Sequence, residues 1–258
     1  MVSAEPLERN FHSGFVALIG RPNVGKSTLV NRFVGEKVAI TSPVAQTTRN
    51  RLRAILSTPS SQLVLVDTPG IHKPHHLLGE RLVKSARTAI GEVDVILLIF
   101  EGCFRPGRGD AFIVDLLKKQ KLPVVVALNK WDLIKETDYK NAEDQYRDLI
   151  QDKRWPIFRC SAESGDGCPQ VIDSLARYLP EGPHLYPPDM ISDQPQKILL
   201  AELIREQVLL HTREEIPHSV AVNIERIEEM SDVKIKNSSK SRTGVLATIF
   251  VERKSQKG

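Results

Sequence analysis

A short glycine-rich stretch near the start of the chain has the residue types that bind the phosphate groups of a nucleotide. It covers residues 20–27 and has the sequence GRPNVGKS. The glycines let the backbone bend, so that successive N–H groups can point at a phosphate beside the positive end of a following helix dipole. Lys26 can reach the β- and γ-phosphates, and the Ser27 hydroxyl can bind Mg²⁺. The alternative is an ordinary turn that opens a helix. If the stretch is a phosphate loop, the other residues expected to bind the nucleotide are Gly20, Arg21, Pro22, Asn23, Val24, Gly25 and the adjacent Thr28.

A second group of residues that could serve the metal and the γ-phosphate follows a run of apolar residues. It consists of Asp67, Thr68, Pro69 and Gly70. Asp67 could hold Mg²⁺ through a water molecule, and the N–H of Gly70 could meet the γ-phosphate with no Cβ in the way. The next residue is Ile71, where many nucleotide-hydrolysing switch proteins have a glutamine that orients the attacking water. Ile71 cannot do so.

The polar segment 37–48 has no steady periodicity and predicts a loop. A threonine hydroxyl in it, from Thr47 or Thr48, could complete the Mg²⁺ shell only when the γ-phosphate is present, which would make the loop a nucleotide sensor. Which of the two does so stays open. The expected catalytic groups are Lys26, Thr48, Asp67 and Gly70, and the expected metal ligands are Ser27, Thr48 and Asp67.

The residues Asn129, Lys130, Trp131 and Asp132 end another apolar run and predict recognition of guanine. Guanine presents two adjacent donors, N1–H and N2–H₂, and the carboxylate of Asp132 can accept both, whereas adenine would leave it unpaired. Such a site can reject the wrong base by about 10⁴ or more. Asn129 would tie this loop to the phosphate loop, and the stem of Lys130 would lie along the base.

A pair of small residues, Ser161 and Ala162, follows the last apolar run and is expected to close the base pocket. The backbone N–H of Ala162 would donate to guanine O6. A Ser-Ala pair alone predicts no function. This pair is expected to close the base pocket only because it follows the phosphate loop and the base loop in the sequence.

Two clusters outside these stretches have simpler explanations than a site. The histidines at 72, 75 and 76 lack the spacing of a common metal-ligand set, which favours a polar loop. Alternating arginines at 49, 51 and 53 are typical of a solvated edge strand, with an RNA-facing surface as the alternative.

Alternating strands and helices predict an α/β fold with a doubly wound, mostly parallel sheet of about six strands. The turn at 58–61 joins two strands that must be antiparallel. Further strands are expected at 15–19, 93–100, 122–128 and 156–160, and helices at 110–120, with Asp110 as the cap, at 139–150 and after Pro169. Every loop with candidate chemistry follows the carboxyl end of a strand.

Five prolines between 180 and 195 indicate a stiff linker and a domain boundary. We expect a nucleotide-binding domain over 1–180, the linker over 181–195 and part of a second domain over 196–258. The second domain should have a helix over 196–211, with an apolar stripe formed by Leu200, Leu203, Ile204 and Val208, and two alternating strands. One helix and one hairpin cannot close a core, so we expect the domain to be incomplete and the faces of its second strand to lack packing.

Composition limits the remaining classes of function. Of the 258 residues, 41% are hydrophobic, and no apolar run approaches the roughly 20 residues that cross a bilayer. The first residues lack the apolar core of a signal peptide. Three cysteines, without metal-ligand spacing, favour a reducing cytoplasm. A net charge of +4 is compatible with a nucleic-acid partner but does not show one.

These motifs, from about residue 15 to the last residue, resemble those of the Era family of bacterial GTPases. The resemblance rests on residues 20–28, 42–49, 67–72, 129–132 and 160–162, and on the tail 216–253. It implies a P-loop GTPase domain that binds GTP or GDP, followed by a type II KH domain that binds the 3′ end of 16S ribosomal RNA. It also implies a role in maturation of the small (30S) subunit, loose peripheral membrane association, a monomer, and a potassium ion held with the help of Asn23. Family members continue into a GxxG loop that clamps RNA, and residues 1–258 end before it. We therefore expect only salt-sensitive RNA binding without sequence preference.

The sequence thus predicts a GTP-hydrolysing switch in ribosome assembly. One alternative is a nucleotide-gated RNA-binding protein whose hydrolysis is incidental. A P-loop kinase for small molecules is disfavoured by Asp132 and by the lack of a candidate acceptor site.

Overall fold

The computed structural model describes residues 11–41, 52–68, 90–212, 220–230 and 242–251. The chain forms two compact units. The first contains Met1–Ala39 and Ala45–Asp193, and the second contains Ile40–Val44 and Gln194–Gly258. The chain therefore leaves the first unit for the short segment Ile40–Val44 and leaves it again after Asp193.

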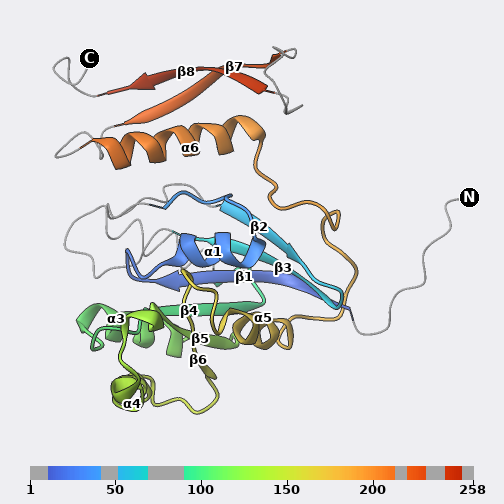
Figure 1. Cartoon of the computed structure of the whole chain (residues 1–258). Helices are drawn as coiled ribbons and strands as arrows, with labels where there is room; N and C mark the ends of the chain where they lie inside the picture. Colours follow the sequence, from blue (N-terminus) through green and yellow to red (C-terminus); the bar gives the residue numbers. More distant parts are fainter. Residues whose placement is uncertain (1–10, 42–51, 69–89, 213–219, 231–241, 252–258) are drawn as a thin grey trace, which may run out of the picture. The chain divides into compact units, whose positions relative to one another are not determined.

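The first unit is built on a six-stranded sheet in the order β2-β3-β1-β4-β5-β6. The strands are β1 (His12–Gly20), β2 (Leu52–Ser57), β3 (Ser61–Asp67), β4 (Val95–Glu101), β5 (Val124–Asn129) and β6 (Ile157–Arg159). Neighbouring strands are parallel, except that β2 pairs with β3 in the antiparallel sense. The expected sheet is confirmed (Figure 1), with β2, which carries Arg53, at its edge.

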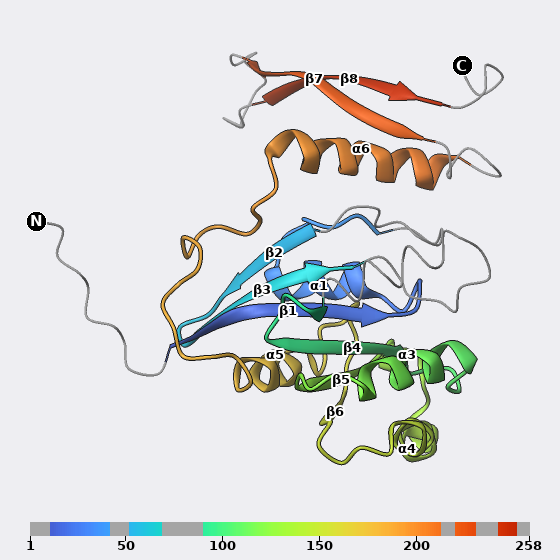
Figure 2. The same ribbon diagram turned by 180° about the vertical axis from the view of Figure 1, so that it is seen from behind.

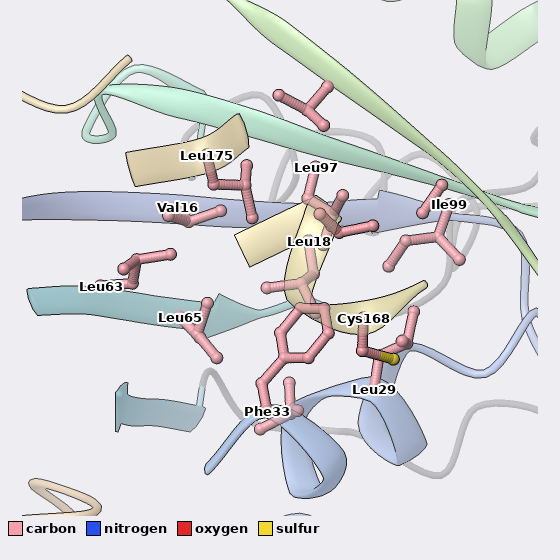
Figure 3. Close-up of a cluster of buried hydrophobic side chains, with 14 of the residues drawn as sticks. Val16, Leu18, Leu29, Phe33, Leu63, Leu65, Leu97, Ile99, Cys168 and Leu175 are labelled. Carbon is pink, nitrogen blue, oxygen red and sulfur yellow. The ribbon is translucent and has the colours of Figure 1, made fainter. Parts of the chain in front are cut away.

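Helices cover both faces of this sheet (Figure 2). On one face lie α1 (Lys26–Val34) and α5 (Cys168–Ala176), and on the other lie α3 (Arg108–Lys118) and α4 (Tyr139–Ile150). Figure 3 shows Leu29 and Phe33 of α1 and Leu175 of α5 directed at apolar side chains of the sheet. Because side chains alternate along a strand, Val16 and Leu18 of β1 face this layer, while Ala17 and Ile19 face α3 and α4.

The start of α3 differs from the prediction that Asp110 caps it. The cap is Gly107, and Asp110 is the third residue of the helix. Its carboxylate still serves the helix end, because Oδ2 accepts the Gly107 N–H at 2.8 Å. The sequence alone did not reveal that Oδ1 has a second partner, Arg21, which draws the carboxylate inward.

The proline-rich segment has no regular element, as expected, but it is not a free linker. Residues 181–193 lie along the first unit, where the Ile55 N–H donates to the Ile191 carbonyl at 2.9 Å. The buried amide of Gln62 holds the middle of the segment: Oε1 accepts the N–H groups of Leu185 (2.7 Å) and Tyr186 (2.9 Å), and Nε2 donates to the Tyr186 carbonyl (2.9 Å). Arg53 forms an ion pair with Asp193 at 3.2 Å. The two compact units divide after Asp193, which lies within the expected linker over 181–195.

The second unit contains α6 (Gln196–His211) and a two-stranded antiparallel sheet of β7 (Ala221–Met230) and β8 (Arg242–Phe250). The bounds of α6 are those predicted, but its apolar stripe is only half-buried. The buried residues of α6 are Arg205, Glu206 and Leu209. Hydrogen bonds compensate the burial of Glu206, because its Oε1 accepts the backbone N–H (2.7 Å) and the hydroxyl (3.1 Å) of Thr41.

Strand β8 leaves large apolar side chains exposed. Val245 and Ile249 on one face are 37% and 46% exposed, and Leu246 and Phe250 on the other are 58% and 55% exposed. The described part of the chain thus leaves apolar area on both faces of this strand, in line with the expectation. In the part of the chain that the structure describes, none of the helices combines the length and the apolar character of a membrane-spanning segment.

We predict that Gln62→Ala loosens the segment 181–193. The change removes its four hydrogen bonds to that segment, one of them to the His184 ring, and leaves two backbone N–H groups without an acceptor. The free energy of unfolding should therefore fall by about 2–4 kcal/mol. Urea unfolding measures this loss, and limited proteolysis should show faster cleavage between 181 and 193. Gln145→Ala, which loses one surface bond to Asn141, is the matched control. Unchanged stability and cleavage in the Gln62 variant would contradict the assignment.

Candidate nucleotide site

The glycine-rich loop lies between β1 and α1, as the sequence predicts. Gly25 caps α1 with a φ of 97°, in the left-handed region that favours glycine. A Cβ added there would lie 2.2 Å from Nδ2 of Asn129, so a side chain at this position would collide with the base loop. Position 25 is therefore restricted to glycine both by its backbone and by its neighbour.

Lys26 points into the phosphate loop rather than to solvent. It is 7% exposed, and its ammonium group donates to the carbonyls of Arg21 (3.0 Å) and Gly20 (3.4 Å). Burial lowers the pKa of Lys26 to about 8, although the nearby Asp67 carboxylate acts in the opposite direction. A bound phosphate would favour the charged form, because it places anionic oxygens beside a desolvated ammonium group.

Ser27 and Asp67 bring two oxygen ligands together at the end of β3. The Ser27 hydroxyl donates to Asp67 Oδ2 at 2.9 Å, and Asp67 is fully buried. A hydroxyl and a carboxylate beside a phosphate loop are the ligand types that Mg²⁺ prefers, so the residues fit this ion. The adjacent Thr68 is buried, and its hydroxyl donates to the Leu18 carbonyl at 2.6 Å, so it fixes the strand end rather than facing a ligand.

Arg21 ties the phosphate loop to α3. Its Nε donates to Asp110 Oδ1 at 2.7 Å, and a Cβ on Gly109 would lie 2.8 Å from Arg21 Cδ. Asp110 is fully buried, which makes this ion pair less screened than a surface pair. The pair holds the first turn of α3 against the phosphate loop.

Asn129 joins three loops with one buried side chain. Its Nδ2 donates to the Val24 carbonyl at 2.8 Å, and its Oδ1 accepts the Ala162 N–H at 2.9 Å. The predicted tie between Asn129 and the phosphate loop is therefore confirmed. In this structure the Ala162 N–H donates to Asn129, and its expected donation to guanine O6 stays a prediction.

The base loop presents Asp132 to solvent, where a base could reach it. Lys130 has a left-handed backbone with a φ of 60°, and its ammonium group is 2.5 Å from Oε1 of Glu101 at the end of β4. The next peptide is fixed as well, since the Trp131 N–H donates to the Cys160 carbonyl at 3.1 Å.

The loop after β6 closes on α1. Arg32 Nε donates to the Ala162 carbonyl at 2.8 Å, and the buried Ser161 hydroxyl accepts the Ser164 N–H at 3.1 Å. Sequence reasoning missed Arg32 and Glu101. The position of Glu101 at the carboxyl end of a parallel strand was a usable signal, whereas nothing in the spacing of Arg32 pointed to this loop.

The structure brings together the described site residues from β1, β3, β5 and the β6 loop. Thr47, Thr48, Pro69, Gly70 and the three histidines lie outside the described residues. Within the described ranges, no cluster of three metal-binding side chains occurs.

We predict that nucleotide affinity falls as the pH rises above about 8. Phosphate binds the charged form of Lys26, and this form is lost from the free protein above its pKa of about 8. The steepest loss for one proton is about tenfold per pH unit. Fluorescent-GDP titrations between pH 7 and pH 9 measure it. Lys26→Arg keeps its charge in this range and should bind without the decline. A flat profile for the unaltered protein would contradict the prediction.

Comparison with known proteins covers both units of the chain. Residues 15–130 match the family model described as 50S ribosome-binding GTPase. The GTPase Era of Crocosphaera subtropica is 53% identical over 248 residues, which are 96% of this chain and 76% of that relative. The GTPase Era of a Nostoc species is 52% identical over 257 residues, or 100% of this chain and 76% of the relative.

A solved structure has a similar fold over almost the whole chain. The crystal structure of Era in complex with MgGDPNP and nucleotides 1506–1542 of 16S ribosomal RNA has a TM-score of 0.83 and 35% identity, and the match covers 96% of this chain and 81% of that one. The phosphate loop and the base loop are those expected of a GTPase, and the relatives are Era proteins. The chain belongs to the Era family of GTPases.

Proposed function

We propose that this GTPase is a nucleotide-dependent switch that acts on 16S ribosomal RNA in maturation of the small ribosomal subunit. The observation that carries the proposal is the similarity over 96% of the chain to an Era structure that holds both a GTP analogue and 16S ribosomal RNA. In this proposal, residues 1–180 form the GTP-binding domain, and residues 196–258 form the first part of a KH domain. Residues 181–193 then belong with the GTP-binding domain, to which they are hydrogen-bonded.

Each part of the site has a separate task in GTP hydrolysis. Lys26 and the N–H groups of the phosphate loop orient the phosphates and offset their charge. Ser27 and Asp67 would hold Mg²⁺, which neutralises phosphate charge when it is bound. Asp132 accepts the two guanine donors, while Asn129 keeps the base loop and the phosphate loop in register. Thr48 and Gly70 are assigned to the γ-phosphate by sequence alone.

Small ribosomal subunits should raise GTP turnover if the protein is a switch of this kind. The measurement compares phosphate release with and without purified small subunits, with large subunits as the control. Equal turnover in all three mixtures, together with nucleotide-dependent RNA binding, would favour an RNA-binding protein whose hydrolysis is incidental. Vesicle sedimentation and analytical ultracentrifugation test peripheral membrane association and the monomeric state, which the family resemblance implies.

Asp132→Asn should exchange guanine for xanthine. The amide offers a donor where xanthine has an acceptor, so the variant should bind XTP, while its GTP affinity should fall about a hundredfold or more with the loss of two hydrogen bonds to a charge. Competition with fluorescent GDP measures both affinities. Asp138→Asn, an exposed carboxylate after the base loop, is the control. Unchanged GTP affinity in the Asp132 variant would refute the base assignment.

We also propose that potassium supports hydrolysis through Asn23. Ile71 cannot orient water, so transition-state charge must be met elsewhere. Asn23 is exposed, so its side chain lies at the surface of the loop, and its backbone is left-handed with a φ of 64°. GTP turnover should be faster in potassium than in sodium at equal ionic strength, and Asn23→Ala should abolish the difference. Equal rates in the two salts would exclude this role.

A further inference from the structure

Trp131 lies between the two residues of the base loop that the proposed function uses, Asn129 and Asp132. Its indole ring is buried, 6% exposed, and its N–H has no hydrogen-bond partner among the described residues. Packing therefore fixes the ring. On one side it lies against Gly102, where an added Cβ would be 2.8 Å from Cε3. Tyr139 contacts it with a ring-centroid distance of 5.1 Å.

Arg159 covers the aromatic pair. Its guanidinium carbon is 5.3 Å from the centroid of Trp131 and 5.5 Å from that of Tyr139, which is the geometry of a cation–π contact to both rings. Arg159 ends β6, so it connects the strand before the Ser161 loop with the aromatic residue of the base loop.

Glu143 of α4 determines where the guanidinium lies. Its Oε2 accepts Arg159 Nε at 2.6 Å, and its Oε1 accepts Arg147 Nε at 2.9 Å. Burial raises the pKa of Glu143, but the hydrogen bonds from Arg147 and Arg159 outweigh this, and the pKa lies below its ordinary value. The carboxylate is therefore charged at neutral pH and keeps Arg159 over the rings.

We propose that Arg159, held by Glu143, is a positioning residue for guanine recognition that acts through the indole of Trp131. This rests on the proposed reading of guanine by Asp132, the next residue after Trp131. With the indole fixed, the backbone of the short helix Trp131–Leu133 keeps the carboxylate in one place. Without the guanidinium, the indole can move away from Gly102, the Asp132 carboxylate loses its fixed position, and bound guanine is released sooner.

The position of Arg159 separates this role from a purely structural one. The Arg159 side chain is 44% exposed, so its removal opens no core cavity, and a surface ion pair of this kind contributes little to folding. The effect should therefore appear in the release rate of the nucleotide and not in the stability of the fold.

The test measures release of fluorescent GDP from the whole chain by stopped flow. Arg159→Gln keeps a donor for Glu143 but has no cation, and it should release GDP about threefold to tenfold faster. Arg159→Lys, which restores the cation, should stay within about twofold of the unaltered rate. Arg147→Gln is the matched control, because it removes the other partner of Glu143 without touching the rings, and its release rate should be unchanged.

Two further measurements separate this proposal from the base assignment. In Asp132→Ala, which should itself accelerate release, adding Arg159→Gln should have no further effect. If Asp132→Ala accelerates release and Arg159→Gln does not, the proposal fails and the base assignment stands. If Asp132→Ala has no effect, the base assignment fails and the proposal with it. Equal acceleration by Arg159→Gln with and without Asp132 would also overturn the role.

A spectroscopic readout follows the indole directly. In a Trp155→Phe background, Trp131 is the remaining tryptophan of the 258-residue chain, and Arg159→Gln should red-shift its emission as the ring gains contact with water. Glu143→Gln provides a second route in case Arg159→Gln does not fold, with the same direction of change in emission and release. Unshifted emission and unchanged release in Glu143→Gln would refute the proposal.

Discussion

The buried amide of Asn129 is the interaction on which the site depends. One side chain donates to the phosphate loop at Val24 and accepts from the loop after β6 at Ala162. An amide suits this place because it offers a donor and an acceptor on one small planar group, whereas a carboxylate would leave a carbonyl unsatisfied. Gly25 lies so close to the amide nitrogen that even a methyl group would displace it. The base end and the phosphate end of the site are thus positioned by the same few atoms.

Electrostatics at the phosphate end follows from burial. Lys26 begins α1, which follows β1, and Asp67 ends the adjacent parallel strand β3. Both residues are almost inaccessible to solvent. A desolvated ammonium group is costly without an anion, and here backbone carbonyls partly satisfy it. This end of the site is therefore arranged for an anionic ligand.

Much of the fold and the site could be predicted because the signals are local. The bounds of α4 and α6 and the antiparallel pairing of β2 follow from residue patterns within a few turns or a short hairpin. The features that could not be predicted depend on partners distant in sequence. The sequence around Asp110 predicts a helix cap, because its pairing with Arg21, 89 residues away, leaves no local signal. Gln62 looks like an ordinary strand residue, although it holds a segment more than 120 residues later. The apolar stripe of α6 was misleading because Glu206, once hydrogen-bonded to Thr41, can be buried more deeply than leucine.

The path of the chain between the two compact units limits how they can be separated. The chain passes from the first unit to the second after Ala39, returns before Leu52, and crosses again after Asp193. Cleavage at the last crossing would leave Ile40 and Thr41 attached to the first unit, and Thr41 would lose the carboxylate that accepts its hydrogen bonds. A GTP-binding fragment that ends at Asp193 would thus contain, within its own sequence, residues that belong to the second unit. A fragment designed from this protein should therefore take into account that residues 40–44 belong to the second unit but lie within the sequence of the first.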